Sequence, residues 1–346
     1  MLSEIATSVR TASSAADETV SVIIPAYNSE RFIRQLLENI AAQYDRGRFE
    51  IIVVDSGSTD ETRKEVERFS LEHEEIDVRL LSNPSKSIPA SLNLGIREAR
   101  GEVIVRMDAH SVPSANYVRR CVELLRNKEA AIVGMPIRVR PGAETRIGEA
   151  IALAVGHPFG IGDARYRMAD QTSQFVDTVP FGAFPKKLWQ DVGGFNESLL
   201  TNEDYDFYYR VRQAGGRILL DTSAHSDYFA RGSLRALIKQ YARYGRWKAQ
   251  MIKLHPRSLR LRQVAAPLFV LALVLMPLVG LWLRFDLWLW LLMLAAYGAL
   301  SLIFAFRLAW KKRRLSLVPA ISLAFFLIHI SWGSSFLVGL FRRPRG

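Results

Sequence analysis

The sequence has very little cysteine, no low-complexity tract and no repeat of the solenoid type. The single cysteine, Cys121, cannot form a disulfide within the chain, so no feature requires an oxidising compartment. Since 49% of the 346 residues are hydrophobic and 23% are charged, the composition excludes a disordered or collagen-like chain. The length predicts about two domains.

Acidic residues are almost missing from the last third of the chain. Residues 1–225 hold 27 basic and 32 acidic groups, a net charge of −5, whereas residues 226–346 hold 19 basic and 2 acidic groups, a net charge of +17. A uniformly basic nucleic-acid-binding protein would not be divided in this way, and we expect no nucleic-acid partner. The pattern predicts a slightly acidic globular domain followed by a basic, apolar tail.

Three long segments of this tail contain no charged residue. They cover residues 264–283, 287–306 and 315–341. About 20 apolar residues cross a bilayer as a helix, whereas helices of a soluble core rarely lack charge over five turns. The sequence therefore predicts a transmembrane region over residues 261–346 of a multi-pass membrane protein.

Basic clusters predict how these segments are oriented. Three arginines precede the first segment, and residues 311–314 are all basic and follow the second. The positive-inside rule places both clusters and the N-terminal domain in the cytoplasm, with residues 284–286 outside. A single crossing by the third segment would put the last three arginines outside, against this rule. The alternative is a re-entrant or interfacial hairpin broken near residues 331–335.

The part of the chain before residue 231 has a different pattern. Residues 1–18 mix Ser, Ala, Thr and charges, which predicts a disordered leader and no signal peptide. Residues 19–230 alternate short apolar runs with amphipathic stretches, and we expect strands over residues 20–24, 49–54, 78–81 and 103–107. Strands alternating with helices indicate an α/β domain with a mostly parallel, Rossmann-like sheet, in which ligands bind beyond the carboxyl ends of the strands.

Polar residues follow three of these expected strands. Tyr27 follows the first strand, Asp55 the second, and Asp108 with His110 the fourth. Asp55 needs a partner at a buried strand end, because an unpaired buried carboxylate is costly. Asp60, later in the same turn, could equally be a helix N-cap. Asp108 and His110 are two positions apart, so both can point to one side and bind a divalent cation.

These motifs resemble those of family 2 glycosyltransferases with the GT-A fold. The similar stretches follow the family's order from about residue 20 to 250 and include residues 22–28, 53–60, 93–101, 108–110, 181–184, 193–197 and 202–212. Residues 106–110, 177–183, 228–231 and 240–247 are similar to the ExoA branch, named for a succinoglycan-assembly enzyme that adds sugar to a lipid-linked acceptor. The resemblance implies a nucleotide-diphospho-sugar transferase domain over residues 19–230.

Two positions depart from the family pattern. Ser56 stands in place of a second Asp after the second strand, so nucleotide contacts there depend on Asp55. The metal motif is Asp108-Ala-His110 and not Asp-x-Asp, which keeps two possible ligands but lowers the negative charge. This change favours weaker or more manganese-selective metal binding.

The resemblance also implies roles for individual residues. Glu203 and Asp204 match the acidic pair that supplies the catalytic base, with Asp204 favoured, although acids at the start of an exposed helix would also fit helix-dipole logic. Asp108 and His110 would hold a divalent cation, Mn²⁺ or Mg²⁺, with His225 as a further candidate. The residues expected at the nucleotide sugar are Pro25, Ala26, Tyr27, Asn28, Asp55, Ser56, Lys86 and Asp108.

Residues 231–260 are expected to form a basic amphipathic interface region. Residues 240–244 are close to the Gln-x-x-Arg-Trp motif of processive synthases, with Tyr in the Trp position. Such a helix suits an anionic bilayer surface. It could also bind the pyrophosphate of a polyprenyl-linked acceptor, with Gln240, Arg243, Arg246 and Trp247 as the candidate residues.

The sequence therefore predicts an inverting hexosyltransferase of the bacterial inner membrane with a cytoplasmic catalytic domain. Its expected donor is UDP-glucose or a similar UDP-hexose, and its expected acceptor is a polyprenyl-pyrophosphate-linked saccharide in exopolysaccharide biosynthesis. Other polysaccharide-assembly proteins are candidate partners. The alternatives are a polyprenyl-phosphate sugar transferase and a catalytically silent membrane scaffold, while a processive synthase is disfavoured by too few spans for a translocation channel.

Overall fold

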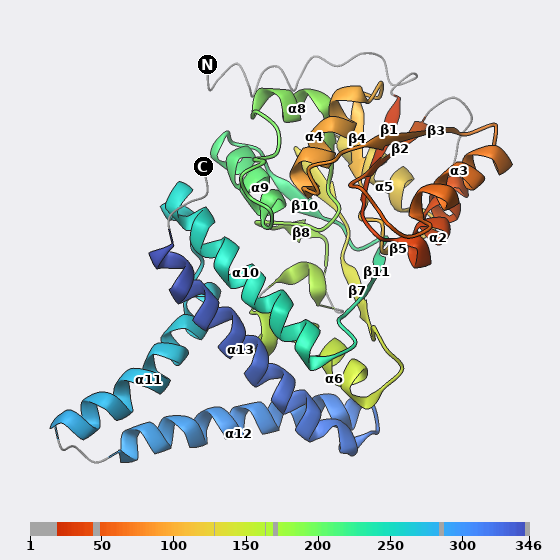
Figure 1. Ribbon diagram of the computed structural model, residues 1–346. Helices are drawn as coiled ribbons and strands as arrows, with labels where there is room; N and C mark the ends of the chain where they lie inside the picture. Colours follow the sequence, from red (N-terminus) through yellow and green to blue (C-terminus); the bar gives the residue numbers. More distant parts are fainter. Residues whose placement is uncertain are drawn as a thin grey trace. The chain divides into compact units, whose positions relative to one another are not determined.

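The computed structural model describes residues 19–43, 49–127, 129–162, 164–168, 172–283 and 287–342. The expected leader and the expected outside loop, residues 284–286, lie outside this described part. The described residues form two units (Figure 1). The first contains those up to Arg138 and those of 172–228, and the second contains those within Val139–Met168 and from Phe229 onward.

The first unit is built on an eight-stranded sheet of order β3-β2-β1-β4-β9-β6-β10-β8. The four strands expected from the sequence form one half of this sheet and run parallel to one another, so the predicted α/β class is confirmed. β9 runs antiparallel to β4 and β6. The strands are β1 (Val20–Ala26), β2 (Phe49–Asp55), β3 (Asp77–Ser82), β4 (Val103–Arg106), β6 (Ile132–Gly134), β8 (Gln174–Phe175), β9 (Ala183–Pro185) and β10 (Ile218–Leu220).

Strand register brings the site together at one edge of the sheet. Ala26 at the end of β1 pairs with Asp55 at the end of β2, and Ile23 pairs with Arg106 at the end of β4. A second, three-stranded sheet of order β5-β11-β7 includes the strand that follows Asp108. Its strands are β5 (Ser111–Pro113), β7 (Ile137–Arg140) and β11 (Ser226–Phe229).

Helices of the first unit bury one apolar face each. In α2, Ile33, Leu36, Leu37 and Ile40 recur at helical spacing and are fully buried. The connections between parallel strands are helical, as βαβ units require. The helices of this unit are α2 (Glu30–Ala41), α3 (Thr62–Glu72), α4 (Ile88–Glu98), α5 (Tyr117–Arg126), α8 (Lys186–Asp191) and α9 (Glu203–Gln213).

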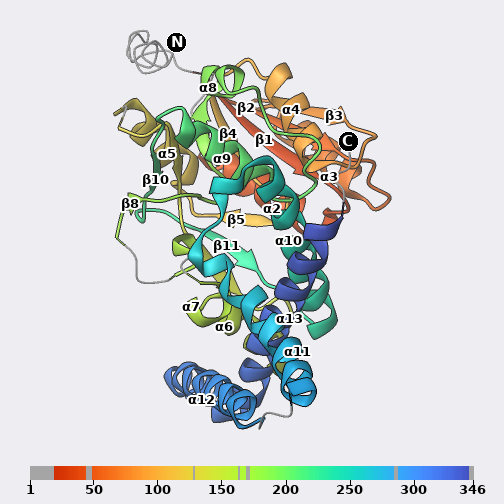
Figure 2. The same ribbon diagram turned by 90° about the vertical axis from the view of Figure 1, so that its left-hand side faces the viewer.

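The second unit is helical. Three of its helices are long and apolar enough to cross a membrane, over Ala265–Trp282, Trp288–Lys311 and Leu315–Phe341. The last of them is a continuous helix through residues 331–335, where a broken hairpin was the alternative expected from the sequence. Figure 2 shows α10 and α13 side by side, as Figure 1 does. The helices are α6 (Arg146–Val155), α7 (Pro158–Ile161), α10 (Leu234–Leu254), α11 (Ala265–Leu283), α12 (Trp288–Lys311) and α13 (Val318–Phe341).

The segment Val139–Met168 groups with the second unit, which differs from the uninterrupted domain 19–230 expected from the sequence. The physical reason is where its apolar side chains pack. Phe159 of α7 lies against Phe325 of α13, with ring centroids 5.0 Å apart, and its carbonyl oxygen is 2.7 Å from His329 Nε2. The apolar side of this segment is therefore buried on α13.

The contact of α4 with the sheet leaves no room for a side chain at Gly95. A Cβ atom there would lie 2.7 Å from Ile23 Cγ2 and 3.1 Å from Val54 Cγ2. We expect Gly95→Ala to lower the free energy of unfolding by about 1–3 kcal/mol, because overpacking displaces both strand residues. Thermal unfolding checks this, with Gly298→Ala as control, since a Cβ at that helical glycine meets nothing within 4 Å. An unchanged melting temperature for Gly95→Ala would contradict the expectation.

Candidate active site

A buried guanidinium stands at the carboxyl end of β4. Arg106 is 5% exposed, and its Nη2 lies 3.2 Å from Asp108 Oδ1 and 3.0 Å from Glu203 Oε1. Its Nε also lies 3.3 Å from Asp108 Oδ1. The backbone N–H of Arg106 donates to Gly182 O at 3.3 Å, which holds the strand end against β9. One cation therefore joins the carboxylate after β4 to the first residue of α9.

The acidic pair at the start of α9 has an unusual ionisation. Burial raises the pKa of Glu203 to about 7, because the desolvation of the charged form outweighs the attraction of Arg106, and the neighbouring Asp204 adds repulsion. Burial also raises the pKa of Asp204, against the attraction of Arg106. Glu203 is buried and paired with Arg106, whereas Asp204 is partly exposed and accepts a hydrogen bond from Tyr205 N at 2.7 Å. Of the two residues, Asp204 is the more exposed.

Asp108 and His110 are close in the chain and lie on the turn between β4 and β5. The Asp108 side chain is 24% exposed, and His110 is partly exposed with its ring centroid 6.3 Å from that of Tyr228. Among the described residues, no group of three or more His, Cys, Asp or Glu side chains is placed to hold a metal ion. If Asp108 and His110 hold a divalent cation, most of its ligands must come from water and substrate phosphate, as is common for Mg²⁺ and Mn²⁺.

His225 lies away from this turn. β5 and β11 are antiparallel, with Ser111 opposite Tyr228 and Pro113 opposite Ser226. This register places His225 beside Ser114, whose Oγ accepts from His225 N at 3.2 Å. In the part of the chain that the structure describes, Asp108, His110 and His225 do not form a group placed to hold one metal ion.

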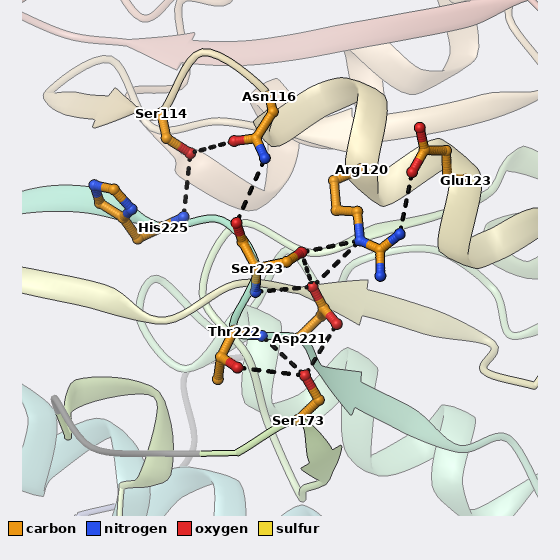
Figure 3. Close-up of polar contacts among 9 residues, drawn as sticks. All are labelled: Ser114, Asn116, Arg120, Glu123, Ser173, Asp221, Thr222, Ser223 and His225. Carbon is orange, nitrogen blue, oxygen red and sulfur yellow. Dashed lines mark hydrogen bonds and ion pairs between the residues drawn. The ribbon is translucent and has the colours of Figure 1, made fainter.

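A polar network holds the start of β11. Figure 3 shows Asp221 at its centre, with the imidazole of His225 pointing away from it. Ser173 Oγ donates to Asp221 Oδ2 at 3.0 Å, and Ser223 N donates to Asp221 Oδ1 at 3.1 Å. Although burial opposes it, these hydrogen bonds and the charge of Arg120 lower the pKa of Asp221. The network anchors three segments to one another and explains why this buried acid is ionised.

The edge formed by β1 and β2 presents an aromatic ring and a buried acid. Tyr27 is 49% exposed, and Lys86 Nζ lies 5.5 Å from its ring centroid. Asp55 is 1% exposed, with Arg63 Nη1 3.2 Å from its Oδ2 and Ser58 N 3.2 Å from its Oδ1. An exposed ring beside a cation suits stacking on a nucleobase, and a carboxylate suits sugar hydroxyls or a base N–H.

The other residues expected at the nucleotide support this edge through burial and hydrogen bonds. Pro25 and Ala26 are buried in β1, and Ser56 N donates to Ala26 O at 2.8 Å. Ser56 Oγ lies 2.9 Å from Ser91 Oγ in the interior. Asn28 Oδ1 accepts from Thr59 N at 2.9 Å, which joins the two turns. These contacts position the turns that carry Tyr27 and Asp55.

The residues expected at the acceptor phosphate lie on α10 of the second unit. Gln240 is 7% exposed, and its Nε2 donates to Tyr244 Oη at 2.9 Å, so it belongs to the packing of this helix. Arg243 and Arg246 are exposed, and Trp247 is partly exposed. The two arginines are therefore the accessible cations of this set.

Arg106 is the site residue that the sequence reading did not single out. The signal was present, because Arg106 ends an otherwise apolar strand, Val103-Ile-Val-Arg. A charge at the end of a buried strand needs acidic partners, since an unpaired buried charge is very costly. The sequence could not show that the partner would be Glu203, 97 residues further along the chain.

Comparisons with known proteins match this chain to glycosyltransferases. Residues 21–192 match the family profile described as Glycosyl transferase family 2. The chain is 27% identical to the succinoglycan biosynthesis protein ExoA of Rhizobium meliloti over 320 residues, which cover 91% of this chain and 93% of that protein. It is 24% identical to a dolichyl N-acetyl-alpha-D-glucosaminyl phosphate 3-beta-D-2,3-diacetamido-2,3-dideoxy-beta-D-glucuronosyltransferase of Methanococcus voltae, over 68% of this chain and 74% of that protein.

A solved structure shares the fold. The mannosyltransferase PcManGT of Pyrobaculum calidifontis, in complex with GDP-Man and Mn²⁺, has a TM-score of 0.58 at 18% identity, over 95% of this chain and 92% of that one. At this identity the likeness establishes the fold alone, which is the GT-A fold expected from the motifs.

The raised pKa of Glu203 predicts a pH dependence of stability. The folded chain keeps the proton up to about pH 7, whereas the unfolded chain loses it near the usual 4.5. The folded state thus binds more protons between these values, so this group lowers stability as pH rises from 4.5 to 7, and its full cost is present above 7. We therefore expect the melting temperature of the wild type to fall more between pH 4.5 and 7 than that of Glu203→Gln.

Melting curves at pH 5, 6, 7 and 8 make the comparison. Glu61→Gln is the matched control, because Glu61 has a 56% exposed side chain and pairs with Lys64 on the helix surface. Its curve should run parallel to that of wild type. Parallel curves for Glu203→Gln would show that the buried carboxyl does not titrate in this range.

Proposed function

Since this chain is a glycosyltransferase that carries a family 2 domain in a GT-A fold, we propose that it is a membrane-bound, inverting hexosyltransferase acting on a lipid-linked saccharide. The observation that carries this proposal is the site around Arg106. It combines a carboxylate of raised pKa, Asp204, with a second carboxylate, Asp108, that can hold a cation. Arg106 thus holds a proposed base and a proposed metal-ion ligand close to each other. This arrangement suits the transfer of a sugar from a diphosphate leaving group.

The proposed reaction uses Asp204 as the base. The acceptor hydroxyl oxygen forms a bond to the anomeric carbon, its proton passes to the Asp204 carboxylate, and the bond between that carbon and the diphosphate oxygen breaks. Attack opposite the leaving group inverts the configuration at the anomeric carbon. Glu203 stays paired with Arg106 and orients the start of α9. A divalent cation held by Asp108 and His110 would supply charge neutralisation for the departing diphosphate.

The donor is proposed to bind at the edge formed by β1 and β2. Tyr27 would stack on the nucleobase, Lys86 would face the phosphates, and Asp55 would accept hydrogen bonds from the ribose or base. We propose a uridine nucleotide and a hexose, with UDP-glucose as the first candidate, on the strength of the resemblance to ExoA. That relative's name places it in succinoglycan biosynthesis, which supports an exopolysaccharide product.

The acceptor is proposed to be a polyprenyl-pyrophosphate-linked saccharide at the cytoplasmic face of the inner membrane. The Methanococcus relative is named for a dolichyl-phosphate-linked acceptor, which supports a lipid-linked one. Arg243 and Arg246 are exposed on α10 and suit the acceptor's pyrophosphate. In this proposal residues 19–230 carry catalysis, residues 231–260 contact the membrane surface, and residues 261–346 anchor the chain.

Transfer assays separate this proposal from its alternatives. The purified full chain is supplied with Mn²⁺, a panel of sugar nucleotides, and either lipid-linked saccharide or polyprenyl monophosphate. We expect transfer to the lipid-linked saccharide alone. Transfer to the monophosphate would identify a polyprenyl-phosphate sugar transferase, and neither transfer nor sugar-nucleotide hydrolysis would indicate a silent scaffold.

The base assignment predicts the behaviour of Asp204→Asn. This change keeps the size of the side chain and removes its basicity, so the transfer rate at saturating donor should fall by roughly 10²- to 10⁴-fold. Donor affinity should be nearly unchanged. Glu203→Gln should reduce the rate less, and the opposite order would mean that Glu203 is the base.

The cation assignment predicts a separate pattern. Asp108→Ala should abolish metal-dependent transfer, and His110→Ala should reduce it less severely, because the carboxylate carries the charge. The check is transfer rate against Mn²⁺ concentration, alongside Mn²⁺ binding measured without acceptor. Full activity of both variants in excess chelator would overturn the cation site.

A further inference from the structure

α13 lies alongside α10 over much of its length, and the two helices run in the same direction (Figures 1 and 2). A Cβ on Gly245 would lie 2.2 Å from Trp332 O, and a Cβ on Gly339 would lie 2.8 Å from Ala249 Cβ. At the ends of the two helices, Gln250 Nε2 donates to Gly339 O at 2.9 Å. Residue numbers therefore rise together along the contact, and the glycines allow close approach.

The carboxyl ends of the two helices are joined by polar contacts. Lys253 Nζ donates to Gly339 O at 3.1 Å and also to Arg342 O. The amino ends are joined through α6. Arg314, just before α13, forms an ion pair with Glu149 in the first turn of α6. Gly142, four residues before α6, is so close to Ala230 that a Cβ would overlap its carbonyl oxygen, and Ala230 lies just before α10. Each end of α13 is thus near the matching end of α10.

α10 has the composition of a helix that stays at a membrane surface. It contains no acidic residue, and its exposed residues include Arg235, Lys239, Arg243 and Arg246, spaced four, four and three apart on one side. Each arginine or lysine at the centre of a crossing helix costs about 2.5–3.5 kcal/mol, so four of them exclude a crossing for α10. A basic stripe of this kind is complementary to anionic lipid headgroups.

These two observations decide the course of α13. We infer that α13 lies in the plane of the membrane, paired with α10 as one amphipathic two-helix unit, and that only α11 and α12 enter the bilayer as a hairpin. The outer surface of this two-helix unit then lies at the boundary between anionic headgroups and acyl chains. This inference rests on the membrane attachment in the proposed function. It also keeps Arg342, which follows α13, on the cytoplasmic side, in agreement with the positive-inside rule.

The pairing explains why α13 is apolar on all sides. Its buried residues, including Ile321, Phe325, Ile328 and Phe336, face the rest of this unit. On its outer side Leu323 is 43% exposed and Val338 is 53% exposed, as expected for side chains in acyl chains. The basic side of the unit is supplied by α10. α13 therefore has the length and composition of a span without the charge pattern of a surface helix.

Depth measurements test the inference on the full chain in vesicles containing anionic lipid. Nitroxide labels are placed at Phe326→Cys, near the middle of α13, and at Phe341→Cys, at its end, which are 15 residues, or about 22 Å, apart along the helix axis. The native Cys121 gives no background, because it is fully buried and burial raises the pKa of its thiol. Label depth is read from accessibility to oxygen and to a water-soluble nickel complex.

We expect the two labels on α13 to lie at the same depth, near the headgroups. A control pair, Leu300→Cys near the middle of α12 and Trp310→Cys at its end, lies on exposed positions 10 residues or about 15 Å apart, and should differ clearly in depth. A clear depth difference between the α13 labels, with Phe326→Cys the deeper, would overturn the inference. Equal depths in the control pair would overturn the crossing by α12.

A second measurement is independent of label depth. Arg342→Cys and Lys311→Cys, both at exposed positions, are treated with a membrane-impermeant maleimide in sealed vesicles. The two cysteines should react from the same side, and reaction from opposite sides would show that α13 crosses. Transfer activity is measured in the same vesicles. Loss of transfer with the expected labelling would count against the proposed function alone, whereas extraction of the protein by carbonate would remove the membrane premise.

Discussion

The buried charge of Arg106 is the constraint on which the site depends. A guanidinium at 5% exposure is tolerated only with acidic partners, and here these are Asp108 and Glu203. Meeting that requirement brings the first turn of α9 to the end of β4. The distance between Asp108 and Glu203, the neighbour of the proposed base Asp204, is thus set by one ion-paired side chain held in the sheet.

The balance of charge at this point explains its chemistry. One arginine faces three carboxylates, those of Asp108, Glu203 and Asp204, so the site keeps an excess of negative charge in a buried place. Burial raises the pKa of Glu203 and Asp204 against the attraction of Arg106, and repulsion from neighbouring carboxylates adds to the rise. The excess of negative charge also leaves Asp108 able to attract a divalent cation. The features suited to a base and to a cation site therefore have the same origin.

The second unit packs a basic helix, α10, together with the long apolar helices α11, α12 and α13. In the pair of α10 and α13, α10 carries the stripe of exposed basic side chains, whereas the exposed side chains of α13 are apolar. A single helix would need both on its own surface. Close approach at Gly245 and Gly339 makes the pair continuous.

The sequence by itself determined the parallel half of the sheet, the turns that carry Tyr27, Asp55 and Asp108, and the three apolar helices, because these follow from local hydrophobic periodicity and length. Tertiary structure decided the rest. The link from Arg106 to Glu203, the position of His225 beside Ser114, the burial of Gln240 and the course of α13 beside α10 depend on strand register and on packing between segments far apart in the chain. The physical reason is that a hydrophobic pattern specifies which face of an element is buried, whereas the partner of that face is chosen by shape and charge across the whole chain.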